Sequence, residues 1–100
     1  MSSSITLFGA GSWGTALAVH LASAGRDVTL WARRPEAVEQ MRRTRHNPRY
    51  LPDLRIPESV RLTSDFQTAA EAADLWAVAV PSQNLRSVAQ RLRPYTDELD

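Results

Sequence analysis

A glycine-rich turn near the start of the chain limits the possible folds more than any other feature. Gly9, Gly11 and Gly14 follow the apolar run at residues 5–8 and open a segment, residues 15–24, with helical spacing of apolar residues. Between a strand and a helix, a G-x-G-x-x-G pattern predicts a dinucleotide-binding turn. Its glycines allow, in order, a tight turn, close approach of a pyrophosphate, and close packing of the helix on the strand. The alternative is an ordinary glycine-rich turn, which would not account for the strand and helix on either side.

The rest of the chain alternates between predicted strands and predicted helices. Strands are predicted at residues 5–8, 28–32, 60–63 and 75–80. Helices are predicted at residues 12–24 and 35–43, from a capping box at Ser64 to Ala73, and from a cap at Ser82 to Pro94. Gly25 follows the first helix, where a C-terminal glycine belongs. This alternation predicts an α/β fold, a doubly wound parallel sheet of the Rossmann type with strand order 3-2-1-4.

The fourth predicted strand, residues 75–80, is almost wholly apolar, although this order places it at an edge of the sheet. An exposed apolar edge invites pairing with another chain. We therefore expect residues 1–100 to form a partial dinucleotide-binding domain that is incomplete at its C-terminal end, or to be covered by a partner.

Composition narrows the possible sites and partners. The 100 residues contain no cysteine, which excludes disulfides, thiolate metal sites and cysteine nucleophiles. The net charge of +1 gives no bias toward nucleic acid, and we expect no nucleic-acid partner. The first 25 residues carry no Lys, Arg, Asp or Glu, but glycines and polar residues interrupt them. They therefore predict neither a signal peptide nor a membrane span, and we expect a cytoplasmic protein.

The titratable residues predict neither a metal site nor a catalytic group. His20 and His46 are far apart, with no acid or cysteine at ligand spacing. Asp65 and Asp74 fall at the boundaries of predicted elements, and no Ser-His-Asp arrangement is indicated. We therefore assign no catalytic residue within this chain.

The basic residues are concentrated in the middle of the chain. All 12 are arginine, and nine of them lie between residues 26 and 61 against five acids, about +4 for this section. An NAD-preferring fold places Asp or Glu about 20 residues past the glycines, on the ribose 2′-hydroxyl. This chain has Arg33 and Arg34 there, and its first acid afterwards is Glu36. The guanidinium groups favour a 2′-phosphate, so we expect NADP(H) to be preferred over NAD(H). Alternatively both arginines cover the surface, which suits Arg34 better.

Two further segments are candidate parts of the site. The backbone N–H groups of Ser12 and Trp13 belong to the first turn of the predicted helix, where a phosphate binds. The ring of Trp13 is expected in the core or in a lid. Val80, Pro81 and Ser82 lie at the carboxyl end of the fourth predicted strand, where the strand order reverses and open α/β sheets bind ligands. For Ser82, a helix cap and a ligand contact both remain open.

Four blocks of sequence together resemble a known family. They are residues 9–18 (GAGSWGTALA), 30–36 (LWARRPE), 47–52 (NPRYLP) and 80–83 (VPSQ). They resemble the amino-terminal portion of bacterial NAD(P)-dependent glycerol-3-phosphate dehydrogenase. The resemblance implies reduction of dihydroxyacetone phosphate, a small phosphorylated substrate, to sn-glycerol 3-phosphate for phospholipid synthesis. It also implies NADPH contacts from Ser12, Trp13, Arg33, Arg34 and Tyr50, and it is compatible with a homodimer.

The resemblance further implies parts that this chain lacks. The family's catalytic lysines and helical substrate domain follow the matched region, past Asp100, and the chain contains no lysine. We expect residues 1–100 to bind a dinucleotide without turning over substrate. Two alternatives remain: a non-catalytic dinucleotide-sensing module that regulates a partner, and the cofactor domain of another reductase of the same fold, of the ketopantoate or 6-phosphogluconate type.

Overall fold

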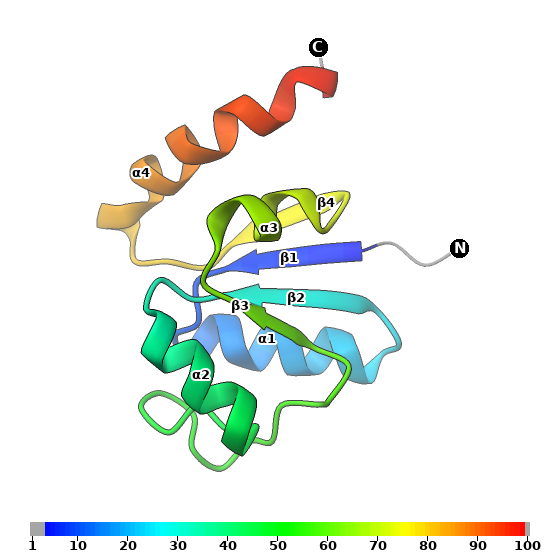
Figure 1. Cartoon of the computed structure of the whole chain (residues 1–100), viewed down its shortest axis with the longest axis vertical. Helices are drawn as coiled ribbons and strands as arrows, with labels where there is room; N and C mark the ends of the chain where they lie inside the picture. Colours follow the sequence, from blue (N-terminus) through cyan, green and yellow to red (C-terminus); the bar gives the residue numbers. More distant parts are fainter. Residues whose placement is uncertain (1–3, 100) are drawn as a thin grey trace.

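The computed structural model describes residues 4–99 and confirms the predicted parallel sheet with helices on both faces (Figure 1). The strands are β1 (Ser4–Phe8), β2 (Asp27–Trp31), β3 (Arg61–Thr63) and β4 (Leu75–Val78). The helices are α1 (Ser12–Ser23), α2 (Pro35–Thr44), α3 (Phe66–Glu71) and α4 (Ser82–Leu92), followed by the 3-10 helix η1 (Arg93–Leu99). The strand order is β3-β2-β1-β4, as predicted. The strand β1 lies between β2 and β4, since Leu7 is opposite both Leu30 and Ala77. The strand order therefore reverses between β1 and β4.

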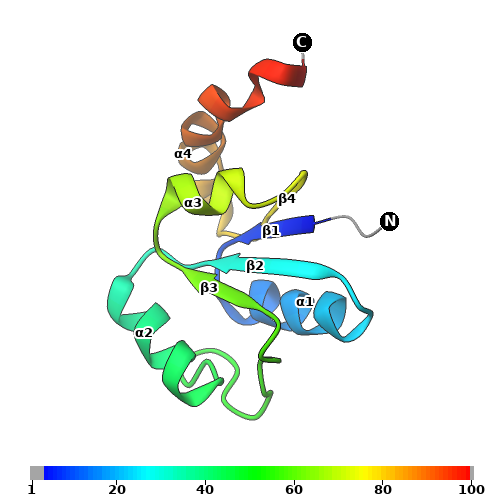
Figure 2. The same ribbon diagram turned by 45° about the vertical axis from the view of Figure 1, so that its right-hand side comes forward.

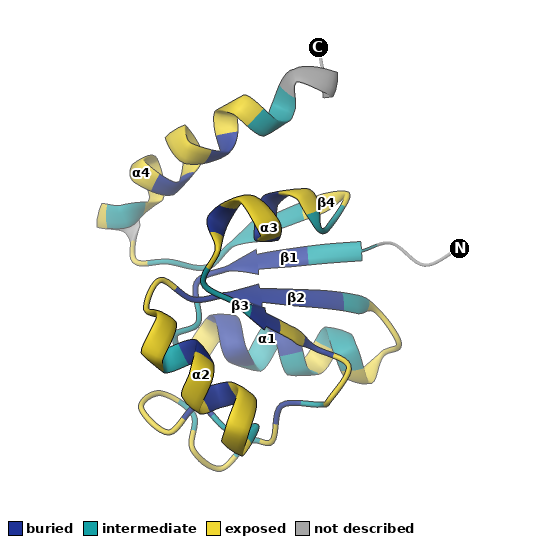
Figure 3. Ribbon diagram, viewed as in Figure 1, coloured by how far each residue is buried: buried dark blue, intermediate teal, exposed yellow. Residues whose placement is uncertain are grey.

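Each face of the sheet has its own apolar core, which Figure 3 shows as buried residues along β1 and β2. On one face, Leu7, Val28 and Leu30 pack against α1 and α2. On the other face, Phe8 and Trp31 pack against α3 and α4. Successive side chains of a strand point to opposite faces, so β1 and β2 supply both cores. Figures 1 and 2 show α1 on the face opposite α3. The two cores therefore fix the carboxyl ends of the central strands in position.

The strand β4 forms one edge of the sheet in the described part of the chain, and Leu75 is 53% exposed there. The strand ends at Val78, two residues before the predicted end at Val80. The N–H of Ala79 donates to the carbonyl of Phe8 at 2.8 Å. Because Phe8 is the last residue of β1, Val80 has no residue of that strand to pair with. That further chain or a partner covers this edge stays a prediction.

The capping box predicted at Ser64 is wrong. The N-cap of α3 is Asp65, no side-chain bond caps this helix, and the helix ends at Glu71 rather than at Ala73. The carbonyl of Ser64 instead accepts a 3.1 Å hydrogen bond from the indole N–H of Trp31. Ser64 is therefore held against the end of β2, one residue too early to cap α3.

The cap predicted at Ser82 is also misplaced, by one residue. Pro81 occupies the N-cap position of α4 in an extended conformation, and Ser82 is the first helical residue. The proline ring fixes φ near the observed −54°, which sets the turn into the helix without a serine cap. At the end of α1, by contrast, Gly25 has a φ of 87°, so the predicted C-terminal glycine is confirmed.

Candidate dinucleotide-binding site

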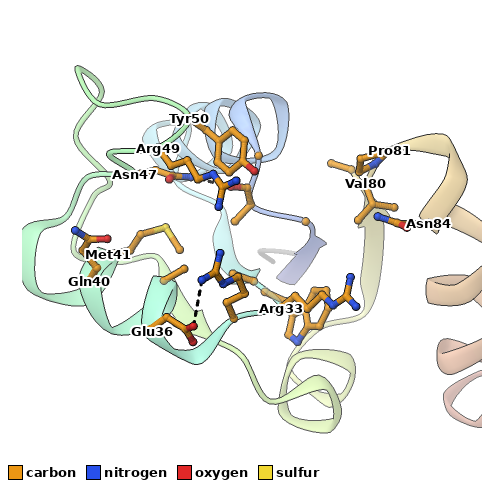
Figure 4. Close-up of a pocket in the computed structure, with 18 of the residues that line it drawn as sticks. Arg33, Glu36, Gln40, Met41, Asn47, Arg49, Tyr50, Val80, Pro81 and Asn84 are labelled. Carbon is orange, nitrogen blue, oxygen red and sulfur yellow. Dashed lines mark hydrogen bonds and ion pairs between the residues drawn. The ribbon is translucent and has the colours of Figure 1, made fainter.

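A cleft of about 850 Å³ opens at the carboxyl ends of the strands (Figure 4). Four segments line it: the turn after β1, the end of β2 with one side of α2, the loop after α2, and the segment after β4 with one side of α4. In Figure 4, Arg49 and Tyr50 lie on one side of the cleft, and Pro81 and Asn84 lie across from them. The cleft thus occupies the place where open α/β sheets bind ligands.

Two of the glycines are required by the packing around the turn. Gly9 has a φ of +124°, and a Cβ there would come within 2.9 Å of Val80 and closer still to the carbonyl oxygen of Ala79. A Cβ on Gly14 would collide with the carbonyl oxygen of Gly9. The turn, the first turn of α1 and the segment after β4 are therefore in backbone contact, which fits the roles predicted for these glycines.

Gly11 differs from both, because a Cβ there would meet nothing within 4 Å. It lines the cleft and is the N-cap of α1, which no side chain caps. The first N–H bonded within the helix belongs to Thr15, which donates to Gly11 at 3.0 Å. The N–H groups of Ser12 and Trp13 precede it, at the positive end of the helix dipole. This open space in front of an uncapped helix fits a phosphate, and a side chain at Gly11 would fill part of it.

The loop after α2 is fastened to the glycine turn by Asn47, which is 6% exposed. Its side-chain amide donates to the carbonyl of Ala10 at 2.7 Å and to the buried hydroxyl of Thr15 at 2.9 Å. The backbone carbonyl of Asn47 accepts a 2.8 Å hydrogen bond from the N–H of Leu51, which closes a turn within the loop. Asn47 therefore sets the position of the loop relative to the turn.

Ser12 and Tyr50 reinforce this junction. The hydroxyl of Ser12 donates to the carbonyl of Tyr50 at 2.9 Å, so Ser12 offers a ligand its backbone N–H rather than its hydroxyl. The side chain of Tyr50 lines the cleft and is 47% exposed, and the guanidinium of Arg49 lies 5.4 Å from its ring centroid. The loop thus presents an aromatic ring and a cation beside the start of α1.

Arg33 and Arg34 both line the cleft, but they differ in their partners. Arg34 forms a 3.3 Å ion pair with Glu36, and both side chains are exposed. The backbone N–H of Glu36 and the bond from Arg34 lower the pKa of the Glu36 carboxyl. The ion pairs found within the described residues do not include Arg33. Arg33 is therefore the better placed of the two to meet an anionic ligand.

Not every predicted site residue lines the cleft. Gly9, Gly11, Arg33, Arg34, Tyr50 and Pro81 do. Ser12 and Gly14 lie behind the lining, in the first turn of α1. The ring of Trp13 is 69% exposed, so placing it in the core is wrong, and it does not line the cleft as a lid. The side chain of Ser82 lies outside what the structure describes; Pro81 takes the N-cap position predicted for Ser82, and the ligand contact of Ser82 stays a prediction.

Sequence reasoning missed several residues that line the cleft: Arg43, Asn47, Arg49, Asn84, Ser87 and Arg91. Asn84, Ser87, Val88 and Arg91 stand at i, i+3, i+4 and i+7 of α4, a spacing visible in the sequence once one face of that helix is known to meet the cleft. Asn47 gave no such signal, because its partners are 32 and 37 residues away.

The described residues contain neither a cluster of metal-ligating side chains nor a membrane-spanning helix. No group of three or more His, Cys, Asp or Glu side chains there could hold a metal ion. None of the helices in residues 4–99 has the length and apolar character needed to cross a membrane.

Comparison with known proteins shows the family. The family model described as NAD-dependent glycerol-3-phosphate dehydrogenase N-terminus matches residues 4–99. The chain belongs to this family. The resemblance carried by the four sequence blocks is therefore confirmed.

Individual relatives agree with the family model. The chain is 75% identical over 96 residues to glycerol-3-phosphate dehydrogenase (NAD(P)+) 2 of Salinibacter ruber, covering 96% of this chain and 28% of that protein. It is 47% identical over 94 residues to the enzyme named glycerol-3-phosphate dehydrogenase (NAD(P)+) of Thioalkalivibrio sulfidiphilus, covering 94% of this chain and 28% of that protein. The crystal structure of a glycerol-3-phosphate dehydrogenase from Coxiella burnetii matches with a TM-score of 0.87 and 36% identity, covering 93% and 29%. The chain thus spans less than a third of the length of these relatives.

Proposed function

We propose that residues 1–100 are the NAD(P)H-binding portion of a glycerol-3-phosphate dehydrogenase. The relatives carry that activity and NAD(P)+ in their names. The observation that carries the proposal is the space in front of Gly11, where an uncapped helix start faces the cleft. In the whole enzyme, the bound dinucleotide would supply the hydride that reduces dihydroxyacetone phosphate to sn-glycerol 3-phosphate.

The chain's own residues would bind and orient the dinucleotide. The turn of Gly9, Gly11 and Gly14, with the N–H groups of Ser12 and Trp13, would hold the pyrophosphate. Arg33 and Arg34 would face the adenosine ribose, and Tyr50, Pro81 and Ser82 would flank the remainder. We assign no catalytic residue to this chain, and we propose that a substrate domain follows residue 100. A cytoplasmic location and a homodimeric assembly stay predictions.

The charge of the cleft supports a preference for NADP(H). Among the described residues, its lining includes Arg33, Arg34, Arg43, Arg49 and Arg91 against one acid, Glu36, which is already paired with Arg34. NADPH carries a pyrophosphate and a 2′-phosphate monoester, and the monoester alone contributes about −1.5 to −2 near pH 7. A cleft with this excess of cations therefore favours the more highly charged dinucleotide over NADH.

A calorimetric titration tests the proposal. The 100-residue chain is first shown to be folded by circular dichroism and is then titrated with NADPH and with NADH. We expect both to bind, with NADPH the tighter. A folded chain that binds neither would contradict the assignment of an independent dinucleotide site to these residues.

A further inference from the structure

The helix α4 presents one stripe of residues to the cleft: Asn84, Ser87, Val88 and Arg91. Val88 is 6% exposed and packs into the apolar core shared with α3, which fixes the rotation of the helix. Arg91 is one turn further along the same stripe and is the only charged member of it. The helix thus brings a cation to the cleft from the side opposite the loop of Asn47.

The guanidinium of Arg91 lies on an aromatic platform. It is 4.0 Å from the ring centroid of Phe66 and 5.8 Å from that of Trp31. Those two rings are themselves buried and meet edge to face at 5.3 Å. A guanidinium that stacks on a ring keeps its N–H groups directed outward in its own plane. The platform therefore holds the charge in place while leaving its donors for an acceptor.

No carboxylate neutralises Arg91 within the described residues, where the four ion pairs involve Arg34, Arg45, Arg55 and Arg61. The position of the platform also indicates which part of the cleft Arg91 lies in. Trp31 is the last residue of β2, only two residues before Arg33, so their Cα atoms are at most about 7 Å apart. The carbonyl of Trp31 also accepts a 3.0 Å bond from the N–H of Gly9, but α1, the helix that follows the glycine turn, packs on the opposite face of the sheet from this platform. Arg91 therefore lies at the same end of the cleft as Arg33.

We infer that Arg91 is a second ligand of the adenosine 2′-phosphate, donating from α4 while Arg33 donates from the end of β2. The inference rests on the proposed function, and it adds a specificity-determining residue on a separate element. A phosphate monoester has three terminal oxygens, so it can accept bonds from two guanidinium groups at once. NADH has a hydroxyl at this position and offers no charge to either arginine.

The test compares two charge-removing variants of the same helix in the full chain. Arg91→Gln removes the inferred ligand, and Arg86→Gln removes a charge from an exposed position of α4 that does not line the cleft. Dissociation constants are measured for NADPH and NADH, and for the fragments 2′,5′-ADP and 5′-AMP. We expect Arg91→Gln to weaken NADPH and 2′,5′-ADP about tenfold, as for one charge-assisted phosphate contact. NADH and 5′-AMP should stay within about twofold, and Arg86→Gln should change none of the four.

Other outcomes would overturn the inference. Equal weakening of NADPH and NADH would mean that Arg91 stacks on the adenine or only supports the packing of α4. An unchanged NADPH to NADH ratio would remove Arg91 from the 2′-phosphate. Arg91→Lys keeps the charge and the aliphatic stem, so it serves if the glutamine variant does not fold; the inference expects it to retain part of the selectivity. A wild-type chain that binds neither dinucleotide overturns the proposed function, and the inference with it.

Discussion

On one side of the cleft, the glycine turn and the loop after α2 are joined by buried polar groups and by backbone contact. Asn47 bonds to the turn twice, Ser12 bonds back to the loop, and Gly9 touches the segment after β4. On the other side, Arg33 and Arg91 reach the cleft from β2 and α4 with exposed side chains. Within the described residues, aromatic stacking is the one interaction found for the side chain of the second, Arg91.

This difference means that one side sets the shape of the cleft, whereas the other side sets which dinucleotide binds. The turn and its loop form the space for a pyrophosphate, which every dinucleotide has, and that space exists only if the backbones pack as they do. The arginines meet a group that distinguishes one dinucleotide from another. Changes on the first side should therefore alter the free energy of unfolding, whereas changes on the second should alter the choice of ligand at nearly constant stability.

The largest effect is expected for Gly9→Ala, measured by urea unfolding. The substitution adds a Cβ at a φ of +124° and against the backbone of Ala79, so strain and overpacking combine. We expect a loss of about 3 kcal/mol or more in the free energy of unfolding.

The matched control for this variant is Gly11→Ala, at a position with nothing within 4 Å and a φ of −77°. It should cost at most about 1 kcal/mol as a change of N-cap residue, yet it should weaken both dinucleotides. Equal stability losses in the two variants would contradict the distinction between a packing glycine and a glycine that leaves room for ligand.

Asn47→Ala should produce the next largest change. It leaves the carbonyl of Ala10 and the hydroxyl of Thr15 without their donor in a buried place, which costs about 2 kcal/mol in the free energy of unfolding. Asn47→Asp is the size-matched control: it keeps the shape but turns an acceptor toward the Ala10 carbonyl, so its loss should be at least as large. If the aspartate variant retained wild-type stability, the loop would not depend on these two bonds.

Arg33→Asp tests the other side of the cleft. It replaces a free cation with the carboxylate that suits a ribose 2′-hydroxyl, so the NADPH to NADH affinity ratio should fall by about tenfold or more. The urea midpoint should stay close to that of the wild type. Arg34→Gln should change the ratio by less than about threefold, because Arg34 is already paired with Glu36 at the surface. An unchanged ratio in the Arg33 variant would remove that residue from the site.

The same contrast explains what the sequence could predict. The fold and the glycine turn follow from local rules, since strand composition, helical spacing and the freedom of glycine are readable within a few residues. Asn47 acts through partners 32 and 37 residues away, and Arg91 acts through a platform built from β2 and α3. Such groups become recognisable only when the packing of the elements is known. The capping box predicted at Ser64 rests on a local sequence pattern. A distant residue decides the outcome there, because the indole N–H of Trp31 donates to the carbonyl of Ser64.

The smallest expected effect concerns Glu36, which holds Arg34 at the rim of the cleft. Its pKa is lowered in the folded chain by its own backbone N–H and by Arg34, so the charged carboxylate stabilises the fold. This contribution is fully present above the ordinary carboxyl pKa, near pH 4.3, and is lost as the pH falls through the lowered folded value. Glu36→Gln should therefore have a slightly lower urea midpoint than the wild type at pH 7, and the two midpoints should converge below about pH 4. The matched control is Glu39→Gln, an exposed acid on the same helix, which should leave the urea midpoint at pH 7 close to that of the wild type. If the urea midpoint of Glu36→Gln stayed below that of the wild type at low pH, Glu36 would stabilise the fold through packing. The charge of the Arg34–Glu36 pair would then not explain its contribution.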